Sequence, residues 1–546
     1  MAKQKAPTEY KNENKEITAK RILNDFKYAY ENKKDWIDAA REDYEFMVGK
    51  QWDDESVRKL EKQGVRALTI NKTRTSVQLL TGIESQNRSD FFAFPEGEED
   101  SIKAEIATKL LKNVMKQSGG EYKISEQFED SLICGEGFIE PYIDYTWDLI
   151  NGEMKFKKLD YGIIFPEPNF KEYDLGDCRF VNKFTTDLTE DELCNIFPDK
   201  EKVISKIENG KMDLIGWINL RNDFGVAIQK RGYGDSNTSK EWNTDIKTYD
   251  LVEYYYKKYV KNYFVADKKL GQIKRANSKE EAMQYVTVYD KDEPGTAGII
   301  ERWIPEIWVA SLVGNTVIDD SVCTFYPRWR GYPIIPCFAH RITAQIKDTE
   351  YKIQGIVRAL KDPNRELNKR RTQELRHLNQ STNSGWLGEK GVFVDKKKWE
   401  DYGSAAGILL EHKEGRPPPI KILPTPLSQG HAQLAAEYAQ DMKEISGINT
   451  DLLAMNENGQ ASGRAINLRQ KQGLVMVQKF FDNLSQTKRL IGRFTVSQLG
   501  KVYDIESAMK VMGEAFIKDN FERPVMMQQP NAMTGQMEEI PQMDAM

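Results

Sequence analysis

The chain has 546 residues, and its 79 lysines and arginines against 84 aspartates and glutamates give a net charge of −5. This length exceeds what one simple core can organise, so we expect two to four modules. The mild acidity argues against a protein that coats nucleic acid. No apolar run reaches the ~18 residues of a membrane span and the N-terminus lacks a signal-peptide core, so we expect a soluble protein with no membrane partner.

Cysteine usage is that of a protein from a reducing compartment. The five cysteines are scattered and form no CxxC pair, which argues against disulfides and zinc and favours buried free thiols. They are Cys134, Cys178, Cys194, Cys323 and Cys337.

The N-terminal part of the chain is predicted to be helical. After residues 1–15, which are polar and expected to be mobile, apolar residues recur at helical spacing in five segments. We predict helices over residues 17–47, 54–62, 72–86, 98–116 and 122–134.

The middle of the chain alternates polar and apolar residues as β-strands do. We predict strands within residues 138–165, with a hairpin turn at Asn151-Gly152, and over 179–186, 248–265, 299–309 and 312–318, with a turn at Gly314-Asn315. Thr189 and Glu192 form a capping box before a short helix, and residues 199–245 are predicted to be a polar insertion. The tyrosines of 248–265 could stack on bases, but the packed face of a sheet is the preferred interpretation.

A proline-rich segment, residues 325–338, is predicted to be a linker or domain edge. Beyond it, residues 352–380 predict one kinked basic helix, or two helices that meet at Asp362-Pro363. Its cations could bind phosphate, form a solvated face or make intersubunit ion pairs, and the sequence leaves these three interpretations open.

The C-terminal part returns to strand and turn over residues 385–426. Helices are predicted over residues 431–445, 464–503 and 506–516. No proline interrupts residues 464–503, which would form a helix roughly 60 Å long at ~1.5 Å per residue. From Pro524 the tail is rich in Met, Gln and Pro, and we expect it to be disordered unless a partner orders it.

The sequence offers no motif for chemistry. It contains no phosphate-binding loop, no GxGxxG after a strand, no HExxH and no GxSxG. The histidines show no metal-ligand spacing; they are His340, His377, His412 and His431. We therefore predict no catalytic residues, no metal and no cofactor, and favour a structural or binding role.

Seven short pieces, in their order along the chain, resemble the portal proteins of tailed bacteriophages of the short-tailed type. No single piece is specific, because several are turns and caps; the ordered set carries the resemblance. The pieces are FMVGKQW (46–52), LTIN (68–71), QNR (86–88), CGEG (134–137), GIVRALKDPNRELN (355–368), ISGI (445–448) and SGRAINLRQKQG (462–473).

The resemblance implies an α+β portal fold with a helix-rich wing and stem, β elements in the wing and clip, and a short crown. The implied parts are a wing over 16–344, a first stem helix over 345–383, a clip over 384–426, a second stem helix over 427–446, a tunnel loop over 447–463, a long wing helix over 464–503 and a crown with its tail over 504–546.

The resemblance also implies a dodecameric ring at one capsid vertex of the virion, assembled in the host cytoplasm, through which double-stranded DNA enters and leaves. The implied partners are the terminase large subunit, the major capsid and scaffolding proteins and a head–tail adaptor. Such a protein is a conduit and docking platform and not an enzyme.

Two groups of residues are then expected at functional surfaces. A polar tunnel loop that neutralises few phosphates suits a low-friction conduit; its candidates are Asn449, Thr450, Asp451, Asn456, Glu457, Asn458 and Gln460. On the first stem helix, intersubunit ion pairs or a position facing the channel are expected of Arg365, Lys369, Arg370 and Arg371.

Two alternatives stay open. Another head–tail connector or collar component of a virion would share the composition but lack the order ISGI, loop, SGRAI, long helix. A metal-dependent nucleic-acid-processing enzyme would need carboxylates brought together, and the nearest candidates are Gly135-Glu136-Gly137 and the acids Asp187, Glu190 and Asp191.

Overall fold

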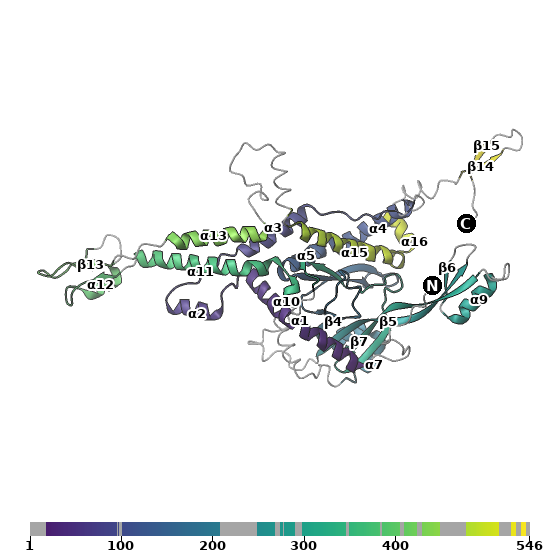
Figure 1. Cartoon of the computed structure of the whole chain (residues 1–546), viewed down its shortest axis with the longest axis horizontal. Coiled ribbons are helices and arrows are strands. Elements are labelled where there is room, and N and C mark those ends of the chain that lie inside the picture. The colour runs from purple at the N-terminus through teal and green to yellow at the C-terminus, as the bar shows by residue number, and fades with distance from the viewer. Residues whose placement is uncertain are drawn as a thin grey trace.

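The computed structural model describes residues 18–95, 97, 101–207, 248–267, 273–276, 278–289, 297–344, 349–382, 385–403, 409–422, 429–447, 475, 477–512, 526–530 and 537–541. The molecule is elongated: a central body carries a projecting helix pair at one end and a long β-ribbon at the other (Figure 1). Residues 1–15 and most of the predicted polar insertion lie outside the described residues.

The five predicted N-terminal helices are confirmed with small shifts at their ends. They are α1 (Ala19–Val48), α2 (Asp54–Lys62), α3 (Lys72–Gln86), α4 (Ser101–Ser118) and α5 (Gly120–Cys134). Side-chain caps begin two of them, because Asp53 accepts a hydrogen bond from the Ser56 N–H and Asn71 accepts one from the Arg74 N–H. α1 ends at Gly49, whose φ of 113° is left-handed and suits glycine.

Most of the strands form two antiparallel sheets. The larger has the order β3-β4-β5-β7-β8, with β6 paired to β5, and the smaller has the order β2-β1-β9. The strands are β1 (Glu136–Asp144), β2 (Glu153–Leu159), β3 (Ile164–Pro166), β4 (Phe180–Thr189), β5 (Thr248–Asp267), β6 (Ile273–Ala276), β7 (Ala297–Val313), β8 (Thr316–Val322) and β9 (Ile335–Phe338). With helices packed on antiparallel sheets, the fold is of the predicted α+β class.

The predicted turns and cap are also present. Val313 pairs with Thr316 across the two-residue turn at Gly314-Asn315, and Gly152, with a φ of 72°, directly precedes β2. The capping box opens α6 (Glu190–Ile196), which η3 (Pro198–Lys200) and α7 (Glu201–Ile204) follow. α9 (Lys279–Tyr289) packs on β5 and β7 at the far end of the ribbon.

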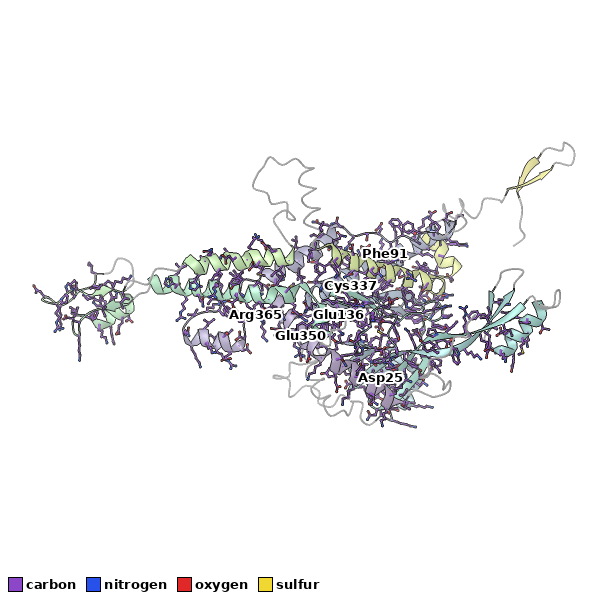
Figure 2. The ribbon with its side chains drawn as sticks, in the orientation of Figure 1. Asp25, Phe91, Glu136, Cys337, Glu350 and Arg365 are labelled. Carbon is purple, nitrogen blue, oxygen red and sulfur yellow. The ribbon has the colours of Figure 1, made fainter. Side chains whose placement is uncertain are left out.

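α5 organises the main core. Its buried residues Ile124, Phe128 and Leu132 belong to the main core cluster. The helix packs on α1, α3, α4, β1, β2 and α11 (Ile356–Thr382). Glu136 and Cys337 lie near the middle of the body (Figure 2). All five cysteines are free thiols, and all but Cys194 are buried.

The tyrosines of β5 pack as core residues, as predicted. The Tyr254 ring stacks on Phe180 at 5.7 Å and on Tyr256 at 5.4 Å, measured between ring centroids. Its hydroxyl donates to Asp25 of α1 at 2.6 Å (Figure 2). These contacts occupy the ring faces that base stacking would need.

Residues 325–338 were predicted to be a linker or domain edge, but residues 335–338 form a buried strand instead. Ile335, Cys337 and Phe338 are buried, and β9 pairs with β1, placing Pro336 opposite Phe138. Because β9 is the edge strand of its sheet, the missing N–H of Pro336 removes no ladder hydrogen bond.

The C-terminal elements differ from prediction in three places. α12 (Lys396–Tyr402) is a helix within a segment predicted as strand and turn; Asp395 caps it by accepting from the Lys398 N–H at 3.3 Å. α15 (Gln478–Val502) covers the later part of the helix predicted over 464–503, and Val475 and Val477 lie in turns; residues 464–474 lie outside the described residues. β14 (Met526–Pro530) and β15 (Met537–Pro541) pair where no regular structure was expected. α16 (Ile505–Met512) matches a predicted helix.

Asp130 of α5 is a buried carboxylate that should make stability depend on pH. It accepts from the Tyr44 hydroxyl and from Lys158, both at 2.7 Å. Burial raises its pKa to about 6, although Lys158 and Tyr44 act in the opposite direction. Between about pH 4 and pH 6 the folded chain therefore holds a proton that the unfolded chain has lost, and stability falls as the pH rises through this range.

The variant Asp130→Asn cannot titrate and should lose this slope. We expect the free energy of unfolding of the wild type, relative to that of the variant, to fall by about 2 kcal/mol between pH 4 and pH 7. Urea unfolding of both proteins at each pH measures the difference. Parallel pH profiles would contradict the assignment.

Candidate functional site at the root of a projecting helix pair

Two antiparallel helices, α11 (Ile356–Thr382) and α13 (Gln429–Ser446), project from the body (Figure 1). Leu360 and Leu367 of α11 and Met442 of α13 join the main core cluster. Of the two predicted arrangements, the single helix is found: α11 runs through Asp362-Pro363 without a break. Pro363 has no N–H, so one carbonyl of the preceding turn lacks its helical partner.

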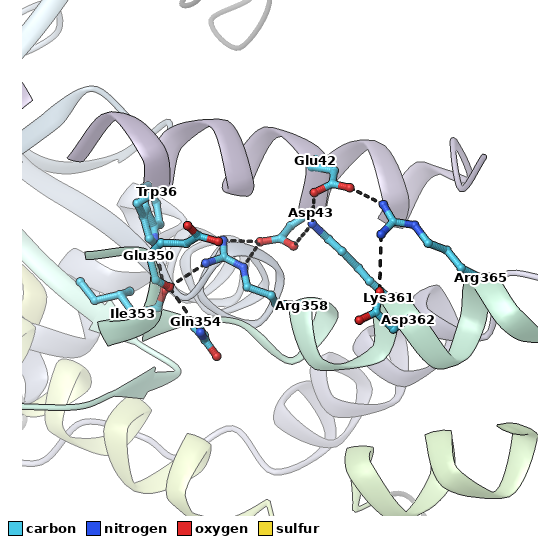
Figure 3. Close-up of polar contacts among 10 residues, drawn as sticks. All are labelled: Trp36, Glu42, Asp43, Glu350, Ile353, Gln354, Arg358, Lys361, Asp362 and Arg365. Carbon is cyan, nitrogen blue, oxygen red and sulfur yellow. Dashed lines mark hydrogen bonds and ion pairs between the residues drawn. The ribbon is translucent and has the colours of Figure 1, made fainter. Parts of the chain in front are cut away.

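Three cations of α11 reach across to two acids of α1 (Figure 3). Arg358 contacts Asp43 at 2.7 Å, and Lys361 lies 2.8 Å from Asp43 and 2.9 Å from Glu42. Arg365 pairs with Glu42 as well. This α1–α11 network fixes the helix pair to the longest helix of the body.

The electrostatics of the network show that its charges must compensate one another. Asp43 is completely buried, and burial raises its pKa despite the opposing effects of Lys361 and Arg358. Burial also acts to raise the pKa of Glu42, but Lys361 and Arg365 outweigh it and lower that pKa. Buried ions in such a set are tolerated only while each keeps its partners.

The other predicted site cations of α11 are paired within the helix. Lys369 lies 2.8 Å from Glu366, Arg370 lies 3.5 Å from Glu366, and Arg371 lies 3.0 Å from Glu374. These are surface pairs one helical turn apart, each worth only a few tenths of a kcal/mol. The expected intersubunit or channel-facing role of Arg365, Lys369, Arg370 and Arg371 stays a prediction.

A row of polar side chains on α11 holds the segment between α2 and α3. Asn364 accepts from the Lys72 N–H at 3.3 Å, Asn368 from the Ile70 N–H at 2.8 Å, and Thr372 from the Leu68 N–H at 3.1 Å. The acceptors on α11 are four residues apart, which corresponds to a rise of ~6 Å in a helix. The N–H donors are two residues apart, which corresponds to ~6.6 Å in an extended chain, so donors and acceptors stay in step.

The same row brings three of the recognised sequence pieces together. Gln51, from FMVGKQW, accepts from the side-chain amides of Asn364 and Asn368. Asn71, from LTIN, donates to the Met47 carbonyl at 2.8 Å. Pieces that lie about 300 residues apart in sequence (Leu68 to Thr372 differ by 304) therefore meet at the root of the helix pair.

Asn368→Ala should loosen this junction. It removes the acceptor of the part-buried Ile70 N–H and one of the two amide donors to the Gln51 carbonyl oxygen, which keeps its bond from Asn364. The loss should be about 1–3 kcal/mol of unfolding free energy. The exposed Gln373, on the same helix, gives the matched control, and Gln373→Ala should change stability by less than about 0.5 kcal/mol. Urea denaturation of both variants measures the loss of unfolding free energy. Equal small losses for the two variants would show that the polar row of α11 does not stabilise this junction.

Two glycine-containing pieces also meet here. A β-carbon on Gly355, at the start of α11, would lie 2.2 Å from the Ile133 carbonyl oxygen, and one on Gly137 would lie 2.3 Å from that of Gln127. Both backbones thus touch α5 where only glycine fits. CGEG and the start of GIVRALKDPNRELN are therefore packing features.

A small unit at the far end of the helix pair has its own core. Trp399 of α12 packs edge-on against Trp386 at 5.0 Å and Phe393 at 5.1 Å, measured between ring centroids. β12 (Trp386–Leu387) and β13 (Ile420–Lys421) pair Leu387 with Ile420, and these two side chains are 67% and 68% exposed. The two residues lie directly opposite each other in the strand pair and form an exposed apolar pair.

The remaining predicted site residues lie outside the described residues. The tunnel-loop candidates Asn449, Thr450, Asp451, Asn456, Glu457, Asn458 and Gln460 all fall within residues 448–474.

Lys33 pairs with Glu136 inside the body, and both side chains are almost fully buried. Among the described residues, no group of three or more His, Cys, Asp or Glu side chains is arranged to hold a metal. The helices of the described ranges include none long and apolar enough to cross a membrane.

Sequence reasoning missed the acids of α1 and the polar row of α11. Glu42 and Asp43 stand on a helix rich in charges, so nothing in the spacing separates buried Asp43 from its solvated neighbours. Asn364, Asn368 and Thr372 did carry a signal: four-residue spacing of short polar residues on one helical face.

A comparison with protein families gives one match. The sequence model of the phage P22-like portal protein family matches residues 23–545, nearly the whole chain. No curated protein matches the chain in a sequence search.

Proposed function

This chain belongs to the phage P22-like portal protein family, and we propose that its copies form a ring at one capsid vertex that conducts double-stranded DNA into and out of the particle. The observation that carries the proposal is the match over nearly the whole chain. The fold supports it, because a body with one projecting helix pair can be repeated around an axis with the pairs side by side (Figure 1).

We propose that the elements divide as the resemblance implied. The body through residue 344 is the wing, α11 and α13 are the stem helices, and the unit over 384–426 is the clip. Residues 447–463 form the tunnel loop, α15 belongs to the long wing helix, and the residues from 504 form the crown. In this arrangement the clip lies farthest from the body, where docking partners can reach it (Figure 1).

The proposed partners follow from these places. The clip would bind the terminase large subunit during packaging and a head–tail adaptor afterwards, and the wing would contact the major capsid and scaffolding proteins. The exposed pair Leu387 and Ile420 gives the clip an apolar surface suited to such docking.

The conduit role is tested in particles. Capsids assembled with and without the chain are treated with nuclease, and the protected DNA is measured. We expect genome-length protected DNA only when the chain is supplied. Genome-length DNA protected equally well without it would overturn the proposal.

The docking role is tested on purified rings. Leu387→Asp with Ile420→Asp should weaken binding of the terminase large subunit at least about tenfold, since an apolar contact becomes a desolvated charge. Phe94→Asp is the matched control, because Phe94 is 86% exposed but lies in the wing. Equal binding by both variants would place docking elsewhere.

A further inference from the structure

A groove runs along one face of the helix pair, between α11 and α13. It is lined by Asp362, Pro363, Glu366, Tyr438, Asp441, Glu444 and Ile445. Its lining combines Ile445, a residue that is 46% exposed, with the carboxylates of Asp362, Glu366, Asp441 and Glu444. Glu366 is neutralised by Lys369 and Arg370, whereas Asp441 and Glu444 have no Lys or Arg partner within the described part of the chain.

The opposite face of the pair is basic. At about 100° per residue, Lys443 points about 160° away from Asp441 on α13, and Arg371 points about 140° away from Glu366 on α11. Lys72, at the start of α3, adds a third cation to this face. Burial is the main cause that lowers the pKa of Lys72, and the nearby charges of Lys443 and Arg371 lower it further. Across the described residues, neither Lys72 nor Lys443 has a carboxylate partner.

We propose that the basic face of one copy, made of Lys72, Arg371 and Lys443, docks on the acidic groove of the next copy around the ring. The proposal rests on the proposed function and names the surface through which neighbouring subunits recognise each other. A closed ring needs two different, complementary patches on each chain, and the two faces of one helix pair supply them. Arg371 is already paired with Glu374, so the direction of the contact comes from Lys72 and Lys443 on one face and from Asp441 and Glu444 on the other.

The two patches lie at the same height along the helix pair, as rotational symmetry about a ring axis requires. Rotation about the ring axis leaves height unchanged, so patches that meet must lie at one level of the chain. Lys443 lies between Asp441 and Glu444 along α13, within ~3 Å of each at ~1.5 Å per residue. The basic and acidic patches are therefore at the same level.

An apolar contact continues the same pairing toward the clip. Toward the clip, Leu375 follows Arg371 by four residues on the basic face, and Leu434 precedes Asp441 by seven residues on the groove side. These two residues are 42% and 37% exposed. Glu366 and Asp441 face each other across the groove at one level of the helix pair. Along the helix axes, Leu375 lies nine residues or ~14 Å from Glu366, and Leu434 lies seven residues or ~11 Å from Asp441, so the two leucines are at similar levels. Packed together, they would bury the exposed leucines of both faces.

Charge reversal tests this directional contact. Lys443→Glu places an acid on the basic face opposite Asp441 of the next copy, and Asp441→Lys places a cation in the groove opposite Lys443 of the next copy. Each variant of the full chain should need at least about tenfold more protein for half-assembly into rings, measured by sedimentation velocity and native mass spectrometry, because attraction becomes repulsion at every interface. Lys279→Glu, at the far end of the molecule on α9, is the matched control and should assemble like the wild type.

The decisive arm is a mixture. An equal mixture of the Lys443→Glu and Asp441→Lys chains should restore ring formation to within about threefold of the wild type, in rings containing equal numbers of each, because alternation makes every interface complementary. Restoration also shows that both variants fold. Single variants that assemble as the wild type does, or a mixture that fails to recover, would overturn the interface while leaving the portal assignment intact. A wild-type chain that forms no ring would overturn the proposed ring and this interface with it.

Discussion

Asp43→Ala is expected to lower the free energy of unfolding by about 3–5 kcal/mol, the range for breaking a buried ionic set by removing one partner. Asp43 is completely buried and is the shared partner of Arg358 and Lys361. Without it, among the described residues, Arg358 keeps the Glu350 carbonyl as its one acceptor and Lys361 keeps half-exposed Glu42 as its one acid (Figure 3). Two cations would then stay buried between α1 and α11 with too little negative charge.

Urea unfolding measures this loss, and two further variants show its origin. Glu42→Ala removes a half-exposed acid from the same network and should cost less than about 1 kcal/mol. Replacing Asp43, Arg358 and Lys361 together by apolar residues of similar volume should recover much of the stability, because no uncompensated charge is left. Equal losses for Asp43→Ala and Glu42→Ala would contradict the central place of Asp43.

Gly355→Ala is the second large effect that we expect, with a loss of about 3 kcal/mol or more from overpacking. The added methyl group would lie 2.2 Å from the Ile133 carbonyl oxygen and 2.5 Å from that of Leu132. Both oxygens belong to the backbone of α5, which is packed on several sides and cannot retreat. The variant must displace the start of α11 from the body.

A second glycine provides the control. Gly82 lies inside α3, and a β-carbon there would meet nothing within 4 Å. Gly82→Ala should therefore stabilise the chain by about 0.5–1 kcal/mol, because alanine is the better helix former. Thermal unfolding of the two variants compares them directly. If both substitutions shift the transition in the same direction, the close approach at Gly355 does not govern stability.

Local patterns in the sequence were sufficient for most elements. α3 was predicted at its observed ends, because its apolar residues recur at helical spacing. The turn at Gly314-Asn315 and the capping box of Thr189 and Glu192 were found for the same reason: their signals lie within four residues.

The errors arose where tertiary structure decides. Pro336 marks a linker by composition, yet it lies in a buried edge strand because its partner β1 is nearly 200 residues earlier in sequence. The site shows the same limit. The basic character of α11 was visible, but the choice of Asp43 as partner for Arg358 and Lys361 depends on how α1 crosses α11 in the fold. The resemblance supplied the function; spacing alone supplied helices, strands and caps.

The central claim is that copies of this chain close into a ring with a channel. Negative-stain imaging of the purified chain, combined with its native mass, tests this most directly. We predict a closed ring of about a dozen copies with a central hole, in which the α11 and α13 pairs of neighbouring copies lie side by side. A closed dimer or tetramer without a channel would contradict it.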